Sequence, residues 1–385
     1  MDSPIVPVTM PKWGLSMRLG KITGWLVAVG DSVGVGDELA DIETEKITGT
    51  LEASSAGPVR RLVAVVGEDV PVGGTIALIA PAEVSEEDLD AAAAAARAVI
   101  DAGVPVLDGD GGPVLETVSV GGRLVKYAGV GAGGDVVLLV HGFGGDRNSW
   151  LFLQEPLAAS FRVYAVDLPG HGASGKDVGV GSLDPLDPLD RLDLLADAVV
   201  GVLDALGADR AHLVGHSMGA AVALAVAARD PERVGSLTLI APAGFGVAIN
   251  AAFLRGFAAA QTRRELKPVV GQLFADEQLV TRQLVEDVLA YKRLDGVSEA
   301  LHALVDMLLD GDAQRVDSVA LLGAVGGAVP VTVVWGGADR IIPAAQAAAV
   351  DGADVVVVDG AGHLPHMERP AEVQAAIEQT IARAG

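Results

Sequence analysis

Cysteine is absent from this chain of 385 residues, which excludes disulfides, thiolate metal sites and a cysteine nucleophile. Aromatic residues are scarce, at 4%, although half of the sequence is apolar. Positive charge is also in short supply, because 27 lysines and arginines face 51 aspartates and glutamates, for a net charge of −24. This balance argues against binding nucleic acid or an anionic membrane through net charge. The length suits two or three globular domains.

Long hydrophobic runs are missing as well. The longest uncharged stretch, 234–254, contains Pro242, Gly244 and Asn250 and is typical of a strand that runs into a loop. The first residues do not combine a basic region with an apolar one, as a secretory signal would. No clustering of metal-ligand residues stands out either. We therefore expect a cytoplasmic protein with no membrane span and no metal.

An internal repeat marks the beginning of the chain. The segment 26–42 recurs as 62–79, and each copy alternates short apolar strands with Gly-Asp or Gly-Glu turns. Two copies are too few for a solenoid, which needs at least three. The repeat therefore predicts a small β-sandwich folded about a pseudo-twofold axis.

A lysine lies between the two copies, in the sequence Ile-Glu-Thr-Glu-Lys-Ile, where we expect a tight hairpin with Lys46 at its tip. Residues 3–80 resemble the lipoyl domains of 2-oxo-acid dehydrogenase complexes. Those domains place glycines 16 residues before and 11 residues after the modified lysine, and Gly30 and Gly57 occupy these positions. The resemblance implies lipoic acid attached covalently to Lys46, although Glu45 replaces the family's usual aspartate. A biotin carrier is less favoured, because its flanking methionines are absent.

The composition changes after residue 80. Ser85 with three acidic residues after it predicts a helix start, and an alanine run follows at 91–96. A glycine-rich break, 108–113, comes next. We interpret 81–113 as a linker, and we expect no subunit-binding domain there because the basic helical pattern of such domains is missing.

The remainder of the chain, 114–385, alternates apolar strands with helical segments. Continuous β-branched runs suit a sheet covered on both faces, and helices between them imply parallel crossovers in a doubly wound α/β fold. The segment 129–134 matches Gly-x-Gly-x-x-Gly, but it joins two strands and opens no helix, so we interpret it as a hairpin turn. The expected strands are 122–127, 135–140, 161–166, 211–215, 235–240, 331–335 and 353–358.

Residues 215–219 read Gly-His-Ser-Met-Gly, in which Ser217 follows a short strand and precedes an apolar helix. Such a strand-to-helix turn exposes the serine hydroxyl, which needs a base and an orienting carboxylate to act as a nucleophile. Asp339 follows the strand at 331–335, and His363 follows the strand at 353–358. We therefore predict a Ser-Asp-His triad, with His366 as a rival base.

The strand at 135–140 ends in His-Gly-Phe-Gly-Gly, whose small residues allow the backbone to approach the nucleophile. The N–H groups of Phe143 and Met218 are the predicted oxyanion hole. These motifs resemble the α/β-hydrolase superfamily, and the resemblance implies that His141, His171 and His216 are structural or shape the pocket. The segment 245–320 has no strand pattern, and we expect it to form a helical cap.

A lipoyl domain fused to an α/β-hydrolase domain resembles the acyltransferase components of acetoin dehydrogenase complexes. The resemblance implies that a thiamine-diphosphate-dependent acetoin dehydrogenase component loads acetyl onto lipoyl-Lys46. The second domain would pass the acetyl group to coenzyme A (CoA), and a dihydrolipoyl dehydrogenase would reoxidise the arm. Ser217 would form an acetyl-serine, or His363 would activate the CoA thiol directly.

Two alternatives stay open at this point. The second domain could be a serine hydrolase, acting on an ester, a thioester or a C–C bond, with the lipoyl domain as a passenger. It could also be a non-catalytic scaffold that docks partner enzymes, although a complete triad argues against this. The basic cluster Arg255, Arg263, Arg264 and Lys267 could hold CoA phosphates, although a solvated helix face is the simpler interpretation.

Overall fold

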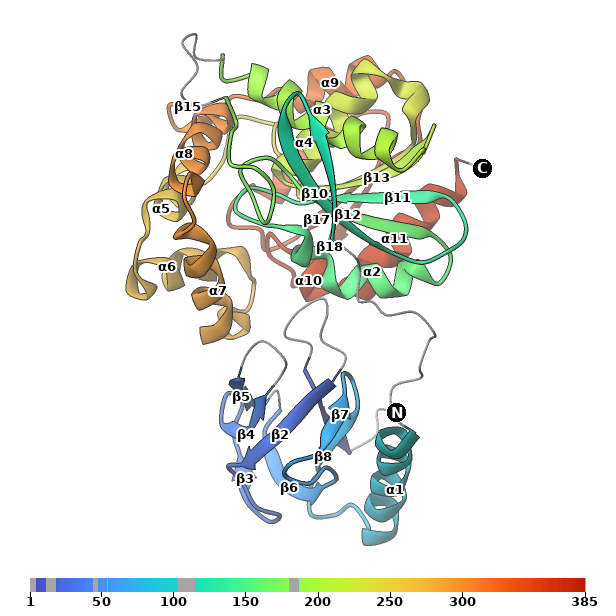
Figure 1. Cartoon of the computed structure of the whole chain (residues 1–385), viewed down its shortest axis with the longest axis vertical. Helices are drawn as coiled ribbons and strands as arrows, with labels where there is room; N and C mark the ends of the chain where they lie inside the picture. Colours follow the sequence, from blue (N-terminus) through green and yellow to red (C-terminus); the bar gives the residue numbers. More distant parts are fainter. Residues whose placement is uncertain are drawn as a thin grey trace. The chain divides into compact units, whose positions relative to one another are not determined.

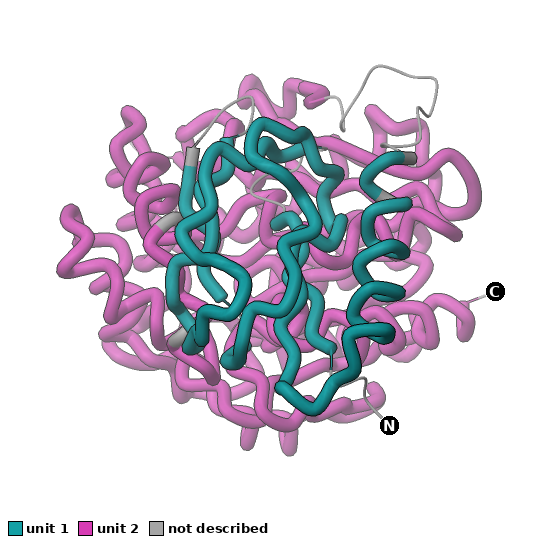
Figure 2. Tube along the Cα trace, turned by 90° about the horizontal axis from the view of Figure 1, so that it is seen from below, with its two compact units in different colours: residues 1–113 teal, residues 114–385 magenta. Residues whose placement is uncertain are grey.

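The computed structural model describes residues 5–11, 19–43, 48–53, 55–102, 115–179 and 187–384. The chain divides into two compact units, residues 1–113 and residues 114–385 (Figures 1 and 2). None of the helices in the described ranges combines the length and the apolar character that a membrane span requires.

Unit 1 is a sandwich of two four-stranded antiparallel sheets. The first sheet has the order β1 (Val6–Thr9), β8 (Thr75–Ile79), β6 (Gly57–Leu62), β3 (Ser32–Val33). The second has the order β5 (Thr48–Glu52), β4 (Glu38–Glu43), β2 (Leu19–Trp25), β7 (Asp69–Pro71). The N-terminal unit is therefore the predicted all-β sandwich.

The internal repeat accounts for the matching order of the two sheets. Each copy gives a short strand to the other copy's sheet, since β3 pairs with β6 and β7 pairs with β2. The Gly30 N–H donates to the Val59 carbonyl over 2.8 Å, and the Gly67 N–H donates to the Ile22 carbonyl over 2.7 Å. These two bonds are related by the same 37-residue shift, as the pseudo-twofold prediction requires.

A helix, α1 (Glu86–Ala102), occupies part of the segment that we expected to be a linker. It packs on unit 1: Leu89 is fully buried, and Ile100 belongs to the sandwich core (Figure 2). Arg61 binds Glu86 and Asp90 on the helix at 2.5 and 2.6 Å. At most residues 103–113 are then left to act as a linker, and all of these lie outside the described residues.

Unit 2 is built on an eight-stranded sheet whose order matches the doubly wound prediction. β9 and β10 pair antiparallel with their neighbours, and the other strands are parallel. From one edge to the other the strands are β18 (Asp354–Val358), β17 (Val331–Gly336), β14 (Val234–Ile240), β13 (Ala211–His216), β11 (Val136–Val140), β12 (Arg162–Asp167), β10 (Arg123–Val130) and β9 (Glu116–Val120).

Both faces of the sheet are covered, which explains the continuous apolar runs. Along β11, Leu138 belongs to the core on one face and Leu139 to the core on the other. Figure 1 shows α3 (Asp190–Ala205), α4 (Met218–Arg229) and α9 (Ser318–Val325) on one side. The opposite side carries α2 (Leu151–Ala158), α10 (Pro365–Glu368) and α11 (Pro370–Ala382). Short 3₁₀ turns are η1 (Arg147–Trp150), η2 (Pro231–Arg233) and η5 (Ala344–Ala349).

The hairpin predicted at 129–134 is wrong, because β12 lies between β10 and β11 in the sheet. The connection instead passes close to the start of β12. A Cβ at Gly131 would lie 2.2 Å from the Phe161 carbonyl oxygen, and one at Gly134 would lie 2.2 Å from that of Ser160. The glycines serve this close backbone approach and two positive φ angles, so no hairpin is needed to explain them.

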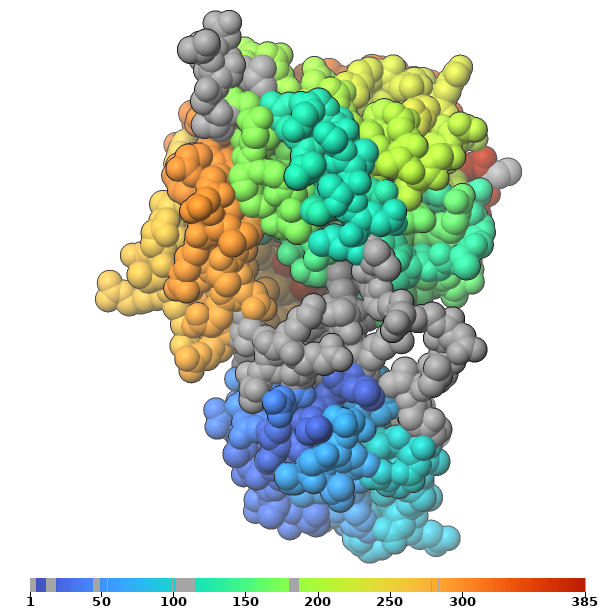
Figure 3. Space-filling view, viewed as in Figure 1, coloured from blue at the N-terminus to red at the C-terminus, as the bar shows by residue number. Residues whose placement is uncertain are grey.

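The cap is helical, as predicted, and its residues gather on one side of unit 2, in yellow and orange (Figure 3). One short hairpin of two-residue strands departs from the expectation of no strands. The α9 helix, which begins at Ser318, packs on α4 and not on the cap. The cap elements are α5 (Ala251–Ala259), α6 (Arg263–Val270), η3 (Gly271–Leu273), η4 (Glu277–Leu279), α7 (Arg282–Lys292), α8 (Val297–Leu308), β15 (Leu309–Asp310) and β16 (Ala313–Gln314).

The packing of α1 generates a test. Leu89→Ala should lower the stability of unit 1 by about 2–5 kcal/mol, because it removes a fully buried side chain and leaves a cavity. Hydrogen–deuterium exchange of the whole chain should then be faster in β6 and β8 and unchanged in unit 2. The exposed neighbour Glu87→Ala is the control and should leave exchange unaltered. Equal exchange in both variants would mean that α1 does not stabilise the sandwich.

Candidate active site

Ser217 lies at the turn from β13 to α4, with a φ of 52° that non-glycine residues rarely adopt. The turn is possible because glycines flank it. A Cβ at Gly219 would lie 2.2 Å from the Val140 carbonyl oxygen, and one at Gly215 would lie 2.5 Å from the Gly219 carbonyl oxygen. Backbone strain of this kind is retained only where the surrounding packing enforces it.

Asp339 and His363 come from the loops that follow β17 and β18, and they form a buried pair. His363 Nδ1 lies 2.8 Å from Asp339 Oδ2, and both side chains are almost fully buried. The other carboxylate oxygen of Asp339 accepts the N–H groups of Ile341 and Ile342 at 2.8 and 2.9 Å. The carboxylate thus assigns the proton to Nδ1 and leaves Nε2 of His363 as the free acceptor.

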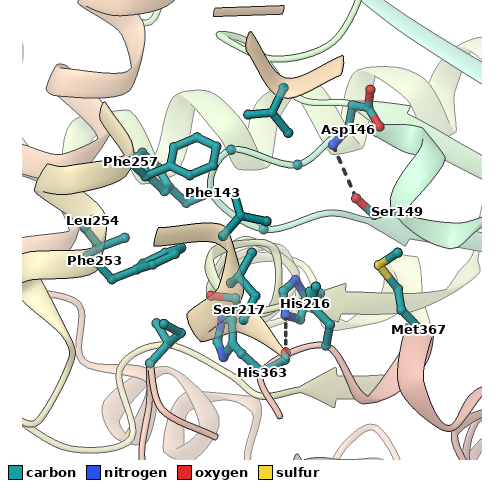
Figure 4. A pocket seen from close by; sticks show the side chains of 18 of the residues that line it. Phe143, Asp146, Ser149, His216, Ser217, Phe253, Leu254, Phe257, His363 and Met367 are labelled. Carbon is teal, nitrogen blue, oxygen red and sulfur yellow. Dashed lines mark hydrogen bonds between the residues drawn. The ribbon is translucent and has the colours of Figure 1, made fainter. Parts of the chain in front are cut away.

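Figure 4 shows the Ser217 side chain next to the His363 ring. Both residues line one cavity, with a volume of about 240 Å³. The structure therefore brings together the three residues that the sequence singled out, although they come from three different strand ends. A serine hydroxyl, an imidazole with a free nitrogen and a buried carboxylate in this order can support nucleophilic catalysis.

The loop after β11 lies against the nucleophile. A Cβ at Gly142 would lie 3.0 Å from that of Ser217, so a glycine is needed for this approach. Met218 is the first residue of α4, where an N–H has no partner within the helix. Among the described residues, no hydrogen bond uses the N–H of Phe143 or of Met218. Both groups are free to bind a developing oxyanion.

Two buried histidines fix the conformation of the loop after β11 through hydrogen bonds. His171 Nε2 accepts the Gly144 N–H at 3.1 Å, and His141 Nε2 accepts the Leu168 N–H at 3.0 Å. Their Nδ1 atoms face carbonyl oxygens, which require an N–H, so both rings are neutral. Burial lowers the pKa of both histidines, in agreement with this state. Neither ring is placed to act as a base for Ser217.

His216 links the turn that contains Ser217 to the loop that carries His363. Its Nε2 donates to the His363 carbonyl oxygen over 2.8 Å, and burial holds its pKa well below the ordinary value (Figure 4). The ring of His366, the rival base, lies against that of His216, tilted by 51°, with 4.7 Å between the ring centroids. Burial lowers the pKa of His366 to about 3. His366 does not line the cavity, and neither ring nitrogen has a partner in the described residues, so we exclude it as the base.

The cavity wall is mostly aromatic and aliphatic, and the cap supplies most of these apolar side chains. Figure 4 shows Phe253, Leu254 and Phe257 of α5 on the side of the cavity opposite Ser217 and His363. Asn148 and Asp287 line the cavity and are also exposed, so they mark its opening. The sequence did not identify these cap residues as part of the cavity. An apolar residue that faces a cavity has the same hydrophobic periodicity as one that faces the core.

A buried lysine supports this wall from behind. Lys292, at the end of α7, donates to the carbonyl oxygens of Phe257 and Ala258 at the end of α5. Its ammonium group lies 5.2 Å from the centre of the Phe257 ring, and burial lowers its pKa to about 8. The lysine thereby satisfies carbonyl groups that the helix end leaves without partners.

The cap segment 271–277 is bound to both loops that carry the Asp–His pair. On the first loop, Arg340 Nη2 donates to the carbonyl oxygens of Gly271 and Phe274 at 2.8 and 2.6 Å. Its Nη1 donates to Glu277 Oε1 at 2.8 Å. Arg340 directly follows Asp339, so the same short loop holds the cap and the carboxylate that binds His363.

Glu368, at the end of α10, accepts the N–H groups of Gly362 on the second loop and of Ala275 in the cap, at 2.7 and 2.9 Å. The His363 N–H donates to the Leu273 carbonyl oxygen over 2.8 Å. We call the contacts of Arg340, Glu368 and His363 with 271–277 the cap clamp. The sequence pattern contained no signal for Arg340 or Glu368, because their partners are backbone groups of a distant segment.

In unit 1, the predicted lipoylation residue Lys46 lies outside the described residues. The strands on either side are described, and Glu43 of β4 pairs with Thr48 of β5. Gly30 and Gly57 both have positive φ angles, and a Cβ at Gly57 would lie 2.8 Å from Ile79 Cγ2. The glycines that carried the resemblance are therefore required by the backbone of the sandwich. Among the described residues, no group of acidic or histidine side chains is arranged to hold a metal ion.

Comparisons with known proteins match both units. A family model described as "Biotin-requiring enzyme" matches residues 6–79, and one described as "alpha/beta hydrolase fold" matches residues 135–370. Among solved structures, 2-hydroxy-6-oxo-6-phenylhexa-2,4-dienoate hydrolase from a Rhodococcus strain covers 70% of this chain and all of its own, with a TM-score of 0.61 and 22% identity. A meta-cleavage product hydrolase from Pseudomonas fluorescens has a TM-score of 0.60 at 21% identity, covering 70% and 98%. These two structures support the fold of unit 2 alone.

Two relatives match over nearly the whole chain, and both are named "Dihydrolipoyllysine-residue acetyltransferase component of acetoin cleaving system". The Pseudomonas putida protein is 47% identical, over 96% of this chain and 97% of its own. The Cupriavidus necator protein is 44% identical, over 98% and 97%. A 2-hydroxy-6-oxononadienedioate/2-hydroxy-6-oxononatrienedioate hydrolase from Paraburkholderia phymatum is 33% identical, over 57% and 76%. Because the first two relatives span both units, the chain belongs to the family of dihydrolipoyllysine-residue acetyltransferase components of acetoin cleaving systems.

Proposed function

We propose that the chain carries an acetyl group on lipoyl-Lys46 and transfers it to CoA within an acetoin-cleaving system. One observation carries this proposal: a single chain joins a lipoyl-type sandwich to a cavity that holds Ser217 and the Asp339–His363 pair. The names of the two full-length relatives support it. The expected partners are a thiamine-diphosphate-dependent acetoin dehydrogenase component and a dihydrolipoyl dehydrogenase.

Lys46 suits covalent lipoylation because it lies in the short connection between β4 and β5, which are paired as far as Glu43 and Thr48. When bound there, the lipoyl group supplies a dithiol that carries acetyl as a thioester between active sites. A tether of this kind raises the effective concentration of the acetyl group at each site. In the second unit, the aromatic and aliphatic cavity wall fits a thioester arm that carries no charge.

In the proposed first half-reaction, Ser217 Oγ attacks the acetyl carbonyl carbon while His363 Nε2 takes the hydroxyl proton. Asp339 stabilises the imidazolium ion that results. The N–H groups of Phe143 and Met218 bind the oxyanion of the tetrahedral intermediate. His363 then returns the proton to the departing sulfur, and an acetyl ester remains on Ser217.

In the second half-reaction, His363 takes the proton of the CoA thiol, and the sulfur attacks the acetyl ester. Collapse of the intermediate returns the proton to Ser217 Oγ and releases acetyl-CoA, so atoms and charge balance. Water would complete the same chemistry as a hydrolysis, and transfer therefore requires that the cavity exclude it. The cap clamp serves this exclusion by holding 271–277 against both catalytic loops.

A serine hydrolase is the second candidate, and one observation favours it. The Paraburkholderia phymatum relative of unit 2 is named a hydrolase and is 33% identical. Esterase, thioesterase and C–C hydrolase activities would all use the same three side chains. An experiment that supplies acetyl-lipoyl chain with and without CoA separates the candidates, because a transferase forms acetyl-CoA and a hydrolase forms acetate in both cases.

Lipoylation generates the first prediction of this function. The chain expressed in a lipoylating host should gain the lipoyl mass increment, and Lys46→Arg should lack it entirely. Lys21→Arg, which changes a half-buried lysine of the same sandwich, is the control and should keep the increment. Intact-mass measurement reads all three proteins. An unmodified wild-type chain would contradict the assignment of Lys46.

The second prediction concerns the nucleophile. Ser217→Ala should lower acetyl transfer to CoA by about 10³-fold or more, because the covalent route is lost. Without CoA, the wild type should accumulate an acetyl adduct on the peptide that contains Ser217. Ser149→Ala changes a second hydroxyl of the cavity lining and should retain most activity. Unchanged transfer in Ser217→Ala would instead favour direct activation of the CoA thiol by His363.

The third prediction concerns the cap clamp. Arg340→Gln should raise the ratio of acetate to acetyl-CoA by about tenfold, because three charge-assisted hydrogen bonds to the cap are lost and water enters. Arg383→Gln removes an arginine of similar exposure from an ion pair with Asp354 and is the matched control. The two products are quantified from the same reaction. A ratio equal to that of the control would mean that the clamp does not exclude water.

A further inference from the structure

The cations of the cap differ from those in the rest of the described chain. Every described lysine or arginine forms a hydrogen bond or an ion pair, apart from one group on two cap helices. Arg60, Arg147 and Arg255, for example, all bind carboxylates. The cations without such a bond in the described residues are Arg263, Arg264, Lys267, Arg282 and Arg293, on α6, on α7 and directly after α7, and all are exposed. In a chain with a net charge of −24, unpaired cations gathered in one place call for an anionic ligand.

Of the two helices, α6 has the stronger positive face. At 100° per residue, Arg263, Arg264 and Lys267 lie within an arc of about 100° on the helix surface. The carboxylate within this helix, Glu265, is committed to its own N-terminus, because it accepts the N–H groups of Gln261 and Thr262 at 3.0 and 3.2 Å. On α7, by contrast, Glu286 follows Arg282 by one turn and offsets its charge. We call Arg263, Arg264 and Lys267 the α6 cluster.

The α6 cluster continues into the cavity wall. Val270, at the end of α6, lines the cavity together with Leu273 and Phe274 of the segment that follows. With a rise of 1.5 Å per residue, Lys267 lies about 5 Å and Arg263 about 10 Å along the helix from Val270. One short helix therefore joins an apolar wall near Ser217 to a group of exposed cations.

We propose that the α6 cluster binds the phosphate groups of CoA while its uncharged thiol-bearing arm enters the cavity. This deepens the proposed function and rests on it. The acceptor has two chemically different parts, and the helix offers a matching surface for each. Phosphate oxygens form charge-assisted hydrogen bonds with arginine and lysine, whereas an amide and alkyl arm fits an apolar wall. Since the rest of the chain is acidic and repels phosphate, the cluster also attracts the acceptor to this helix.

The test compares two double variants that each remove two positive charges from exposed, unpaired arginines. Arg263→Gln/Arg264→Gln changes the α6 cluster, and Arg282→Gln/Arg293→Gln is the matched control. Each protein is assayed with S-acetyl-dihydrolipoamide as donor and with CoA or pantetheine as acceptor, since pantetheine lacks the nucleotide phosphates. CoA binding to each protein is measured separately by calorimetry.

We expect the α6 variant to raise the KM for CoA about tenfold, with kcat and the KM for pantetheine unchanged. The control should leave the KM for CoA within about twofold of the wild type. Added salt should raise the KM for CoA in the wild type and less in the α6 variant.

An unchanged KM for CoA in the α6 variant would overturn the proposal. So would an equal loss of transfer to CoA and to pantetheine, because the cluster would then act without recognising the phosphate groups. If the wild type transfers acetyl but binds CoA independently of α6, the proposed function stands and the cluster assignment falls. If it binds CoA through α6 but transfers no acetyl group, the assignment stands and the proposed function falls.

Discussion

The close approach of α4 to the end of β11 is the constraint on which the active-site region depends. Gly219 has no room for a Cβ beside the Val140 carbonyl oxygen, and this contact holds Ser217 in its strained conformation. It also places the loop that contains Gly142 and Phe143 next to Ser217. Because β11, β13, β17 and β18 are parallel, the loops after their carboxyl ends meet at one edge of the sheet. Asp339 and His363 therefore lie near Ser217 although the three residues are far apart in the sequence.

The region around this edge is held by neutral hydrogen-bonding groups. Burial keeps the pKa of His141, His171 and His216 low. The neutral rings of His141 and His171 each donate one hydrogen bond and accept another, and His216 donates to the His363 carbonyl oxygen. Unlike these three histidines, His363 has a carboxylate partner, Asp339. A buried charge is costly without a partner, so neutral supports allow the Asp339–His363 pair to carry the charge that develops at the site. The cap clamp adds backbone contacts from 271–277 to the same two loops.

Composition and tertiary structure together shape the proposed acetyl transfer. A chain without cysteine has no thiol of its own that could take the acetyl group in place of CoA. A chain with a net charge of −24 repels a phosphate-bearing acceptor, so a local group of unpaired cations on α6 is needed to attract it. Both units are compact, and α1 belongs to the first of them, so fewer residues are left to connect the two than the sequence indicated.

The sequence by itself determined both fold classes, the pseudo-twofold repeat and the positions of Ser217, Asp339 and His363, because local rules govern them. Glycine spacing, β-branched runs and the order of strand ends are properties of nearby residues. Only the tertiary structure decided which residues line the cavity, that α1 packs on the sandwich and that the segment 129–134 crosses β12. Only the tertiary structure decided, too, that Arg340 and Glu368 hold the cap. These features depend on contacts between segments far apart in the chain. The local sequence around an apolar or charged residue is the same whichever distant segment it contacts, so it does not reveal that partner.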